Sequence, residues 1–294
     1  AISFTGPVTG TNFSWTNDST SIGLGASGIG NIPSFIANNN GSVPITSVVR
    51  VSPSIGGSTS DSVVYNYTGS LQTWTVPAGI TTANFEAVGA QGGSVTVTCA
   101  ATGGKGARMI GDIAVTPGET ISIMVGQQGP TNGSNGGGGG GTFVVRTGNV
   151  PLIVAGGGGG ASNNITMCGA NRDGKDAVTT TSGTSSGNGL VAGGTPTNGG
   201  GASNGSGGGG GGFTTNGTPG SGGTTNGGKS YVNGGAGGSA GAVTVAGGYG
   251  GGGGAWSTGG NGGGGGGYAG GATSGTQPYT GGGGGGSYNS GTNQ

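Results

Sequence analysis

The sequence predicts an all-β protein that also contains polyglycine II helices and has essentially no α-helix. Three observations carry this prediction. Glycine accounts for 87 of the 294 residues, and much of it lies in uninterrupted runs. Short apolar segments with strand-like alternation lie between these runs. No segment shows the periodicity of an amphipathic helix.

The glycine runs are residues 136–141, 156–160, 207–212, 250–254, 262–267 and 281–286. Glycine loses more backbone entropy on folding than any other residue and buries no side chain, so a helix or an ordinary strand does not explain such runs. In the polyproline II conformation the chain has about three residues per turn, and its N–H and C=O groups point sideways. Because these groups must be paired when buried, we expect a bundle of parallel and antiparallel glycine helices.

Two other glycine-rich states compete with this bundle. Collagen requires glycine at every third position and abundant proline, whereas this chain has whole glycine runs and 11 prolines. A flexible linker is the stronger alternative, because glycine-rich chains with few charges are commonly disordered. The regular run lengths, the apolar segments and the aromatic residues that follow most runs favour order. These aromatic residues are Phe143, Phe213, Trp256, Tyr268 and Tyr288.

Residues 1–57 differ from the rest of the chain and predict a partial β-sandwich repeat. Strand-like segments, among them TNFSWTN and PSFIAN, are separated by turn signals, with Trp15 and Phe35 as expected core residues. The stretches SWTN, SIGLGASGIGNIPSF and TSVVRVSP resemble PKD-like or immunoglobulin-like repeats of very large exported adhesins in Bacteroidetes. The resemblance implies further modules upstream in the natural gene product.

Residues 58–294 form the second predicted domain, a β-scaffold that carries the glycine helices. Strand-like segments are expected at 63–67, 83–88, 112–115 and 120–125, with Pro117–Gly118 as a hairpin turn between the last two. A second hairpin-like pair consists of residues 142–146 and 151–155, which stand between two glycine runs.

The second domain also has a family resemblance. Its stretches WTVPAG, GAQGG, PGETISIMVGQQG, GGGGGGTFVV and VPLIVAGGGGGA look like the glycine-rich extracellular domain of the anaplastic lymphoma kinase and leukocyte tyrosine kinase receptors, and like bacterial surface versions of it. The resemblance covers residues 60–294 and implies a β-framework with a packed bundle of glycine helices. It does not carry the receptor function, because no matching motif marks a ligand site. Bacterial relatives have a closing strand after the last glycine run, so we expect a C-terminal part beyond Gln294.

The sequence predicts no enzyme, metal site or cofactor. The absence of His and the wide separation of the two cysteines exclude the common nucleophilic triads. Asp173 and Asp176 depart from calcium-loop spacing. A glycosidase needs a pair of carboxylates, which here would have to come from Asp61, Glu86, Asp112 and Glu119. All four look like solvated strand or turn positions, so no such pair is expected. No glycine run continues into the Lys-Ser or Lys-Thr of a phosphate-binding loop.

Charge and hydropathy restrict the partners. Seven basic and seven acidic residues give zero net charge, and the basic residues are scattered singly, so no nucleic-acid partner is expected. No apolar run reaches the roughly 20 residues of a membrane span. A neutral surface rich in backbone polar groups has little to oppose self-association, so a homo-oligomer or filament is expected.

The composition, rich in hydroxyl and amide side chains, is common in secreted surface proteins, so we expect an extracellular, cell-surface location. Cys99 and Cys168 are the right number for one disulfide, which would close a loop of about 70 residues and contribute roughly 4 kcal/mol. Two unpaired thiols are the alternative.

Three functional classes follow. The first is a non-enzymatic structural or adhesive module at the end of a larger adhesin or surface filament. The second is a receptor-like domain for a protein or glycan ligand, with contact residues Tyr249, Trp256, Tyr268, Tyr279 and Tyr288. Caps on the ends of glycine helices are the alternative role of these aromatics. The third is ice binding, which needs a regular file of Thr or Ala, but the threonines cluster irregularly.

Overall fold

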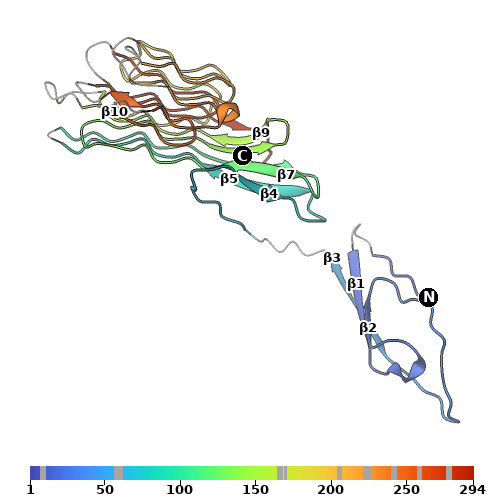
Figure 1. Cartoon of the computed structure of the whole chain (residues 1–294). Coiled ribbons are helices and arrows are strands. Elements are labelled where there is room, and N and C mark those ends of the chain that lie inside the picture. The colour runs from blue at the N-terminus through green and yellow to red at the C-terminus, as the bar shows by residue number, and fades with distance from the viewer. Residues whose placement is uncertain are drawn as a thin grey trace. The chain divides into compact units, whose positions relative to one another are not determined.

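The computed structural model describes residues 1–6, 11–55, 62–97, 99–163, 168, 171–203, 207–220, 227–239, 244–256, 260–275 and 280–294. These residues form an all-β structure, in which the helices are two single turns, η1 (Thr20–Ile22) and η2 (Tyr231–Asn233) (Figure 1). The chain divides into two compact units, Ala1–Val64 and Tyr65–Gln294. The sequence pattern places this boundary slightly earlier, between residues 57 and 58.

The first unit contains a three-stranded antiparallel sheet in the order β2-β1-β3, formed by β1 (Thr11–Asn17), β2 (Ser27–Ile29) and β3 (Val49–Ile55). Trp15 is buried, as the sequence predicts, and it packs in one cluster with Leu24 and Ile32. The prediction for Phe35 is wrong, because its side chain is 40% exposed. The segment PSFIAN forms no strand, so Phe35 lies on a stretch that the described sheet does not cover.

The second unit contains a five-stranded sheet in the order β12-β9-β8-β7-β4 and a two-stranded sheet of β5 and β6, all pairs antiparallel. A further short pair joins β10 and β11. The strands are β4 (Gln72–Thr75), β5 (Thr82–Val88), β6 (Arg108–Ala114), β7 (Thr120–Met124), β8 (Thr142–Arg146), β9 (Val150–Ala155), β10 (Thr244–Val245), β11 (Ala255–Trp256) and β12 (Tyr288–Asn289).

One predicted hairpin is confirmed and the other is wrong. Strands β8 and β9 pair as expected. Strand β6 pairs with β5, and β7 pairs with β4 and β8, so the turn at Pro117–Gly118 connects two different sheets. Apolar residues of β6 and β7 still meet, because Ile113 and Ile121 belong to one core cluster between the sheets. The expected strand at residues 63–67 is also wrong, since this segment is irregular.

The five-stranded sheet is apolar on both faces. Alternation along β7 and β8 sends Ile123 and Val144 into the core shared with Met109 of β6. The same alternation sends Met124 and Phe143 to the opposite face, where they contact aromatic residues from later parts of the chain. Strands of a sheet that is buried on both sides have continuous apolar sequences, such as FVV in β8 and LIVA in β9.

Two glycine runs are continuous with strands of the five-stranded sheet. Run 136–141 leads directly into β8, and β9 leads directly into run 156–160. All six runs are buried, and none of them forms a regular helix or strand. In Figure 1 the runs appear as long traces that lie side by side and extend from the sheets toward the end that carries β10.

Backbone hydrogen bonds connect each run to its neighbours with a period of three residues. In run 136–141, the N–H groups of every third residue donate to the same segment, at N···O distances from 2.8 to 3.0 Å. Gly136 and Gly139 donate to residues 158–161, Gly137 and Gly140 to residues 127–130, and Gly138 and Gly141 to residues 250–253. A β-strand bonds alternately to two sides, whereas this run bonds to three neighbours.

The same period recurs in the other long runs. In run 262–267 the three acceptor segments are residues 280–283, 136–139 and 208–211, and all three run parallel to it. In run 207–212 the neighbours include residues 251–254, which run antiparallel. The hydrogen-bonded runs therefore include both parallel and antiparallel neighbours.

The packing leaves no room for side chains at nearly every position within the runs. A Cβ atom added to Gly158 would lie under 3.0 Å from the backbone of Gly104, and one added to Gly209 would meet the backbone of Gly200 in the same way. The atoms that would be met are main-chain carbonyl groups, which cannot rotate away as a side chain can. Glycine is therefore required by contact with the neighbouring backbone.

This contact predicts the effect of single methyl groups. Gly158→Ala and Gly209→Ala should each lower the free energy of unfolding of the second unit by about 2 kcal/mol or more, because the added Cβ separates hydrogen-bonded segments. Chemical denaturation followed by tryptophan fluorescence and far-UV circular dichroism measures the change.

Gly254→Ala is the matched control inside the bundle. Its added Cβ would find its nearest atoms at 3.2 Å, which is a tight contact but not an overlap. We expect a clearly smaller loss than at Gly158. Unchanged or raised stability at all three positions is the behaviour of a flexible linker, in which alanine only reduces unfolded-state entropy, and it would contradict the packed bundle.

Candidate functional site

An aromatic cluster covers one end of the glycine bundle. Phe143, Phe213 and Tyr231 are buried, with Phe213 stacked on Tyr231 at a ring-centroid distance of 5.1 Å. Tyr268 and Tyr288 are half-buried and stack on each other at 4.6 Å. The cluster packs against the face of the sheet that carries Met124, Val145 and Val154. It therefore joins the ends of the runs to the β-framework.

The direction of each run explains which aromatic residue enters the cluster. Runs 136–141, 207–212, 262–267 and 281–286 all point toward the sheet, so the aromatics that follow them meet there. Run 250–254 points the opposite way, so Tyr249, which precedes it, packs against the cluster. Trp256, which follows that run, lies instead in β11, paired with Thr244.

The structure thus brings together three of the five predicted contact residues, Tyr249, Tyr268 and Tyr288. Trp256 is half-buried outside this cluster, and Tyr279 lies outside the described residues. Burial raises the pKa of Tyr249 and of Tyr268 above the usual tyrosine value. Their hydroxyl groups are therefore neutral near pH 7 and can both donate and accept hydrogen bonds.

A layer of buried polar residues marks the opposite ends of three runs. Asn135, Asn261 and Thr280 each stand immediately before a run and are fully buried. The Asn135 side chain accepts a hydrogen bond from the Asn163 N–H, and that of Asn261 accepts one from the Thr280 N–H, at 3.1 and 2.9 Å. This layer was not predicted from the sequence, although a polar residue stands directly before each of these runs.

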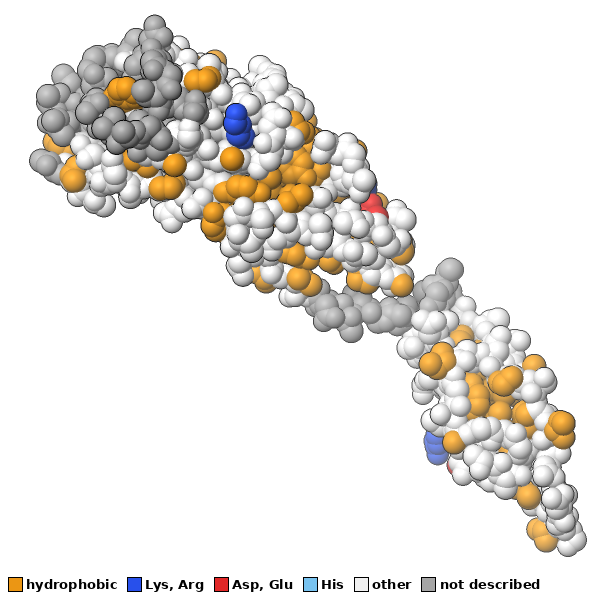
Figure 2. All heavy atoms as spheres, viewed as in Figure 1, with side chains coloured by type: hydrophobic (Ala, Val, Ile, Leu, Met, Phe, Trp, Pro, Cys, Tyr) orange, Lys and Arg blue, Asp and Glu red, His pale blue; other side chains and the backbone are white. Residues whose placement is uncertain are grey.

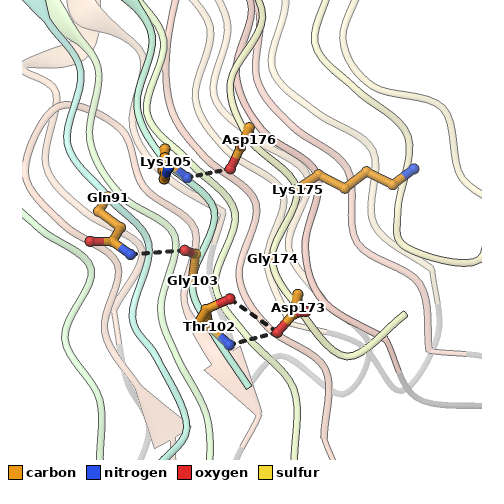
Figure 3. Close-up of a pocket in the computed structure, with 8 residues that line it drawn as sticks. All are labelled: Gln91, Thr102, Gly103, Lys105, Asp173, Gly174, Lys175 and Asp176. Atoms are coloured by element: carbon orange, nitrogen blue, oxygen red, sulfur yellow. Dashed lines mark hydrogen bonds between the residues drawn. The ribbon is translucent and has the colours of Figure 1, made fainter. Parts of the chain in front are cut away.

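One shallow hollow lies along the side of the bundle, beside the segment NRDGKDA (Figure 3). Its volume is about 500 Å³, and the residues around it include Gln91, Thr102, Lys105, Asp173 and Asp176. The Asp173 carboxylate accepts hydrogen bonds from the N–H and hydroxyl of Thr102, at 2.6 and 3.1 Å. The Asp176 carboxylate accepts one from the Lys105 N–H at 2.6 Å.

The side chains of Asp173 and Asp176 accept backbone hydrogen bonds at the same three-residue spacing as the glycine runs. Gly104 and Ala107 donate to the run 156–160, whereas Thr102 and Lys105 donate to carboxylates in place of backbone carbonyls. Each carboxylate thus has one oxygen engaged in holding the backbone. Among the described residues, no three His, Cys, Asp or Glu side chains come together in a group that could hold a metal ion.

The described carboxylates that a glycosidase would need are engaged elsewhere. Glu86 forms an ion pair with Arg108 at 2.7 Å, and Asp112 accepts hydrogen bonds from two asparagine side chains. Glu119 binds Arg146 through both carboxylate oxygens, at 2.7 and 3.1 Å, which connects the start of β7 to the end of β8. Asp61 lies outside the described residues.

A second shallow hollow lies beside β12. Its volume is about 400 Å³, and its lining consists of Met109, residues 179–181, residues 287–289 and Gln294. None of these lining residues has a charged side chain. Cys99 and Cys168 form a disulfide, with their Cα atoms 5.5 Å apart, and the buried Arg172 donates to the Cys99 carbonyl beside it.

Comparison with known proteins assigns no family, since no protein-family model and no curated sequence matches the chain significantly. None of the helices among the described residues has the length and apolar character needed to cross a membrane.

Figure 2 shows one face of the molecule, on which charged side chains are sparse and polar and backbone atoms dominate.

The aspartate contacts predict a difference between two double variants. Changing both Asp173 and Asp176 to Ala leaves the N–H groups of Thr102 and Lys105 without their acceptors. We expect a loss of about 1–3 kcal/mol in unfolding free energy. Changing both residues to Asn retains an acceptor oxygen and should cost clearly less. Equal losses for the two variants, measured by urea denaturation, would refute this role for the carboxylates.

The Glu119–Arg146 pair predicts a pH dependence. Hydrogen bonding from Arg146 lowers the pKa of Glu119 below its usual value of 4.5. A lowered folded-state pKa means that the stabilisation is present above about pH 4.5 and is lost as the pH falls through the folded value. Glu119→Gln should therefore cost about 1 kcal/mol at pH 7, since both side chains are partly exposed.

Thermal unfolding of both forms between pH 7 and pH 2 tests this linkage. The difference between wild type and Glu119→Gln should shrink as the pH falls below 4.5 and approach zero once the carboxyl is protonated. A difference that stays constant over this range would show that the variant acts through packing and not through the charge of Glu119.

Proposed function

We propose that this chain is a non-enzymatic structural and adhesive module of an extracellular surface, in which the second unit is a bundle of polyglycine II helices. One observation carries the proposal, namely the three-residue period of the lateral hydrogen bonds. It equals the number of residues per turn in a polyproline II helix. The absence of room for a Cβ supports the same geometry, because only glycine permits such close approach.

The side chains support a structural role over a catalytic one. The sequence has no His, and the described carboxylates at Glu86, Asp112, Glu119, Asp173 and Asp176 each hold a neighbouring backbone or side-chain group. The disulfide between Cys99 and Cys168 supports an oxidising, extracellular location, where such bonds persist. The likeness of the glycine-rich stretches to receptor and bacterial surface domains agrees with this location.

Two properties support an adhesive role, namely the rigidity of the hydrogen-bonded bundle and the zero net charge of the chain. A bundle held by backbone groups fixes the positions of the segments at its ends, so side chains on those segments are presented in defined places. The half-buried Tyr268 and Tyr288 favour the second candidate, a receptor-like domain for a protein or glycan ligand. Ice binding receives no such support, because the exposed threonines at residues 179–181 form no regular file.

Single-molecule force spectroscopy of the full chain between reference domains tests the structural role. We expect the second unit to extend in a cooperative event with a distinct force peak, because many lateral hydrogen bonds must break together. Under oxidising conditions the disulfide keeps the segment between Cys99 and Cys168 from extending, and these two residues are 69 positions apart. Reduction should therefore lengthen the extension by about 230 Å.

Gly158→Ala serves as the comparison, because it should lower the peak force without altering the total extension of the reduced chain. A smooth, featureless extension of the wild-type chain under both conditions would refute the proposal. That result is the behaviour of a flexible glycine linker, whose ends separate without crossing a barrier.

A further inference from the structure

The neutral hollow beside β12 combines an oriented aromatic ring with a wall of hydroxyl and amide groups. Its volume of about 400 Å³ lies within the range of small-molecule sites. Residues from three separate parts of the chain form it, namely β6, the threonine segment 179–181 and the C-terminal strand β12. Sites of this composition have groups for both the apolar and the polar faces of a sugar.

The aromatic group is fixed before any ligand arrives. Tyr288 stacks on Tyr268 at 4.6 Å with an interplanar angle of 23°, and Tyr268 contacts the buried Phe213 at 6.1 Å. Main-chain pairing of Tyr288 with Val154 of β9 fixes its backbone as well. Tyr288 remains half-buried and is one of the residues that line the hollow. A preorganised ring lowers the entropy lost when a ligand packs on it.

The polar wall is likewise held by the bundle. Val178 donates to the Gly285 carbonyl and Ser287 donates to the Thr180 carbonyl, at 3.0 and 2.8 Å, so the threonine segment is bonded to the last glycine run. The side chains of residues 179–181 remain exposed. Hydroxyl groups both donate and accept hydrogen bonds, which matches the hydroxyl groups of a sugar. The Asn289 amide is oriented by the Ile110 carbonyl at 2.7 Å.

The absence of charged side chains, and of cationic ones above all, from the lining decides the class of ligand. The hollow beside Asp173 contains two aspartates and two lysines, whereas the hollow at β12 contains no ionisable side chain other than the Tyr288 phenol. A phosphate, a sulfate or a uronic acid would lose its hydration there without gaining a counter-charge. Neutral hydroxylated ligands lose less, because each hydroxyl can exchange water for threonine or amide groups.

We propose that the hollow at β12 binds one or two neutral sugar units of a surface polysaccharide. The sugar packs its C–H face on Tyr288 and bonds its hydroxyl groups to residues 179–181. This inference rests on the proposed adhesive function and specifies its ligand. The hollow is open to solvent, so it recognises a unit within a longer polymer as readily as a free oligosaccharide.

Isothermal titration calorimetry of the full chain tests the proposal with neutral oligomers of glucose, mannose, galactose and N-acetylglucosamine. A heparin oligosaccharide is the anionic comparison. We expect saturable binding of at least one neutral oligomer and no saturable binding of heparin. The affinity for the neutral oligomer should not change when sodium chloride is raised, because no charged side chain lines the hollow.

Two variants test the site. The triple change Thr179→Val, Thr180→Val and Thr181→Val removes the hydroxyl groups and keeps the side-chain shape, and we expect about a tenfold loss of affinity. Tyr288→Leu removes the flat ring and should weaken binding by a similar factor. The matched control changes the exposed Thr73, Thr75 and Thr82 of β4 and β5 to Val, and it should bind as wild type does.

Thermal unfolding separates loss of binding from loss of fold, since the threonine triple variant should unfold at the wild-type temperature. Unchanged affinity in that variant, or no saturable binding by any neutral oligomer, overturns the sugar site. Binding of heparin alone also overturns it. None of these results affects the cooperative force peak, so the bundle can be correct while this inference fails.

Discussion

The lateral hydrogen bond between glycine backbones is the interaction on which the second unit depends. Each bond is worth little by itself, roughly 1 kcal/mol, and it forms only where two main chains approach without intervening Cβ atoms. Because the donors of run 136–141 reach three different neighbours, the bonds form a network in cross-section and not a sheet. The chain thus replaces much of a side-chain core with a core of peptide groups. This explains how a sequence with 29% hydrophobic residues buries all six glycine runs.

The ends of that network need side chains, because the last peptide groups of a run have no further glycine run to bond to and would otherwise be exposed to water. At one end the four runs that point toward the sheet are followed by Phe143, Phe213, Tyr268 and Tyr288, which close the bundle with an apolar layer. At the other end Asn135 and Asn261 supply side-chain acceptors for neighbouring N–H groups. The β-framework is thereby continuous with the bundle, since strands β8 and β9 are extensions of glycine runs.

Local patterns predicted much of this unit. The runs, the β8–β9 hairpin and the alternation of β5 are visible in the sequence because each depends on residues close together in the chain. The pairing of β6 was predicted wrongly, since a Pro-Gly turn fits a hairpin and also a crossing between stacked sheets. The separation of Trp256 from the other aromatics also escaped prediction, because it depends on the direction of run 250–254, which its own residues do not encode. Phe35 was misplaced because the segment PSFIAN, which contains it, does not form the expected strand. The hollow at β12 joins residues more than 100 positions apart, so no local pattern marks it.

The three-residue period also constrains how such a chain can change length. Inserting one or two glycines into a run would turn every later donor toward a different neighbouring segment, whereas inserting three would turn it back toward the same segment, one turn further along. In the polyglycine II geometry that we propose for the runs, three residues add about 9 Å. A gene for this kind of protein can therefore lengthen its product by whole turns, through in-frame duplications of nine nucleotides within glycine codons. Because other insertions exchange the neighbouring segments, the length of a run is expected to vary in steps of one turn.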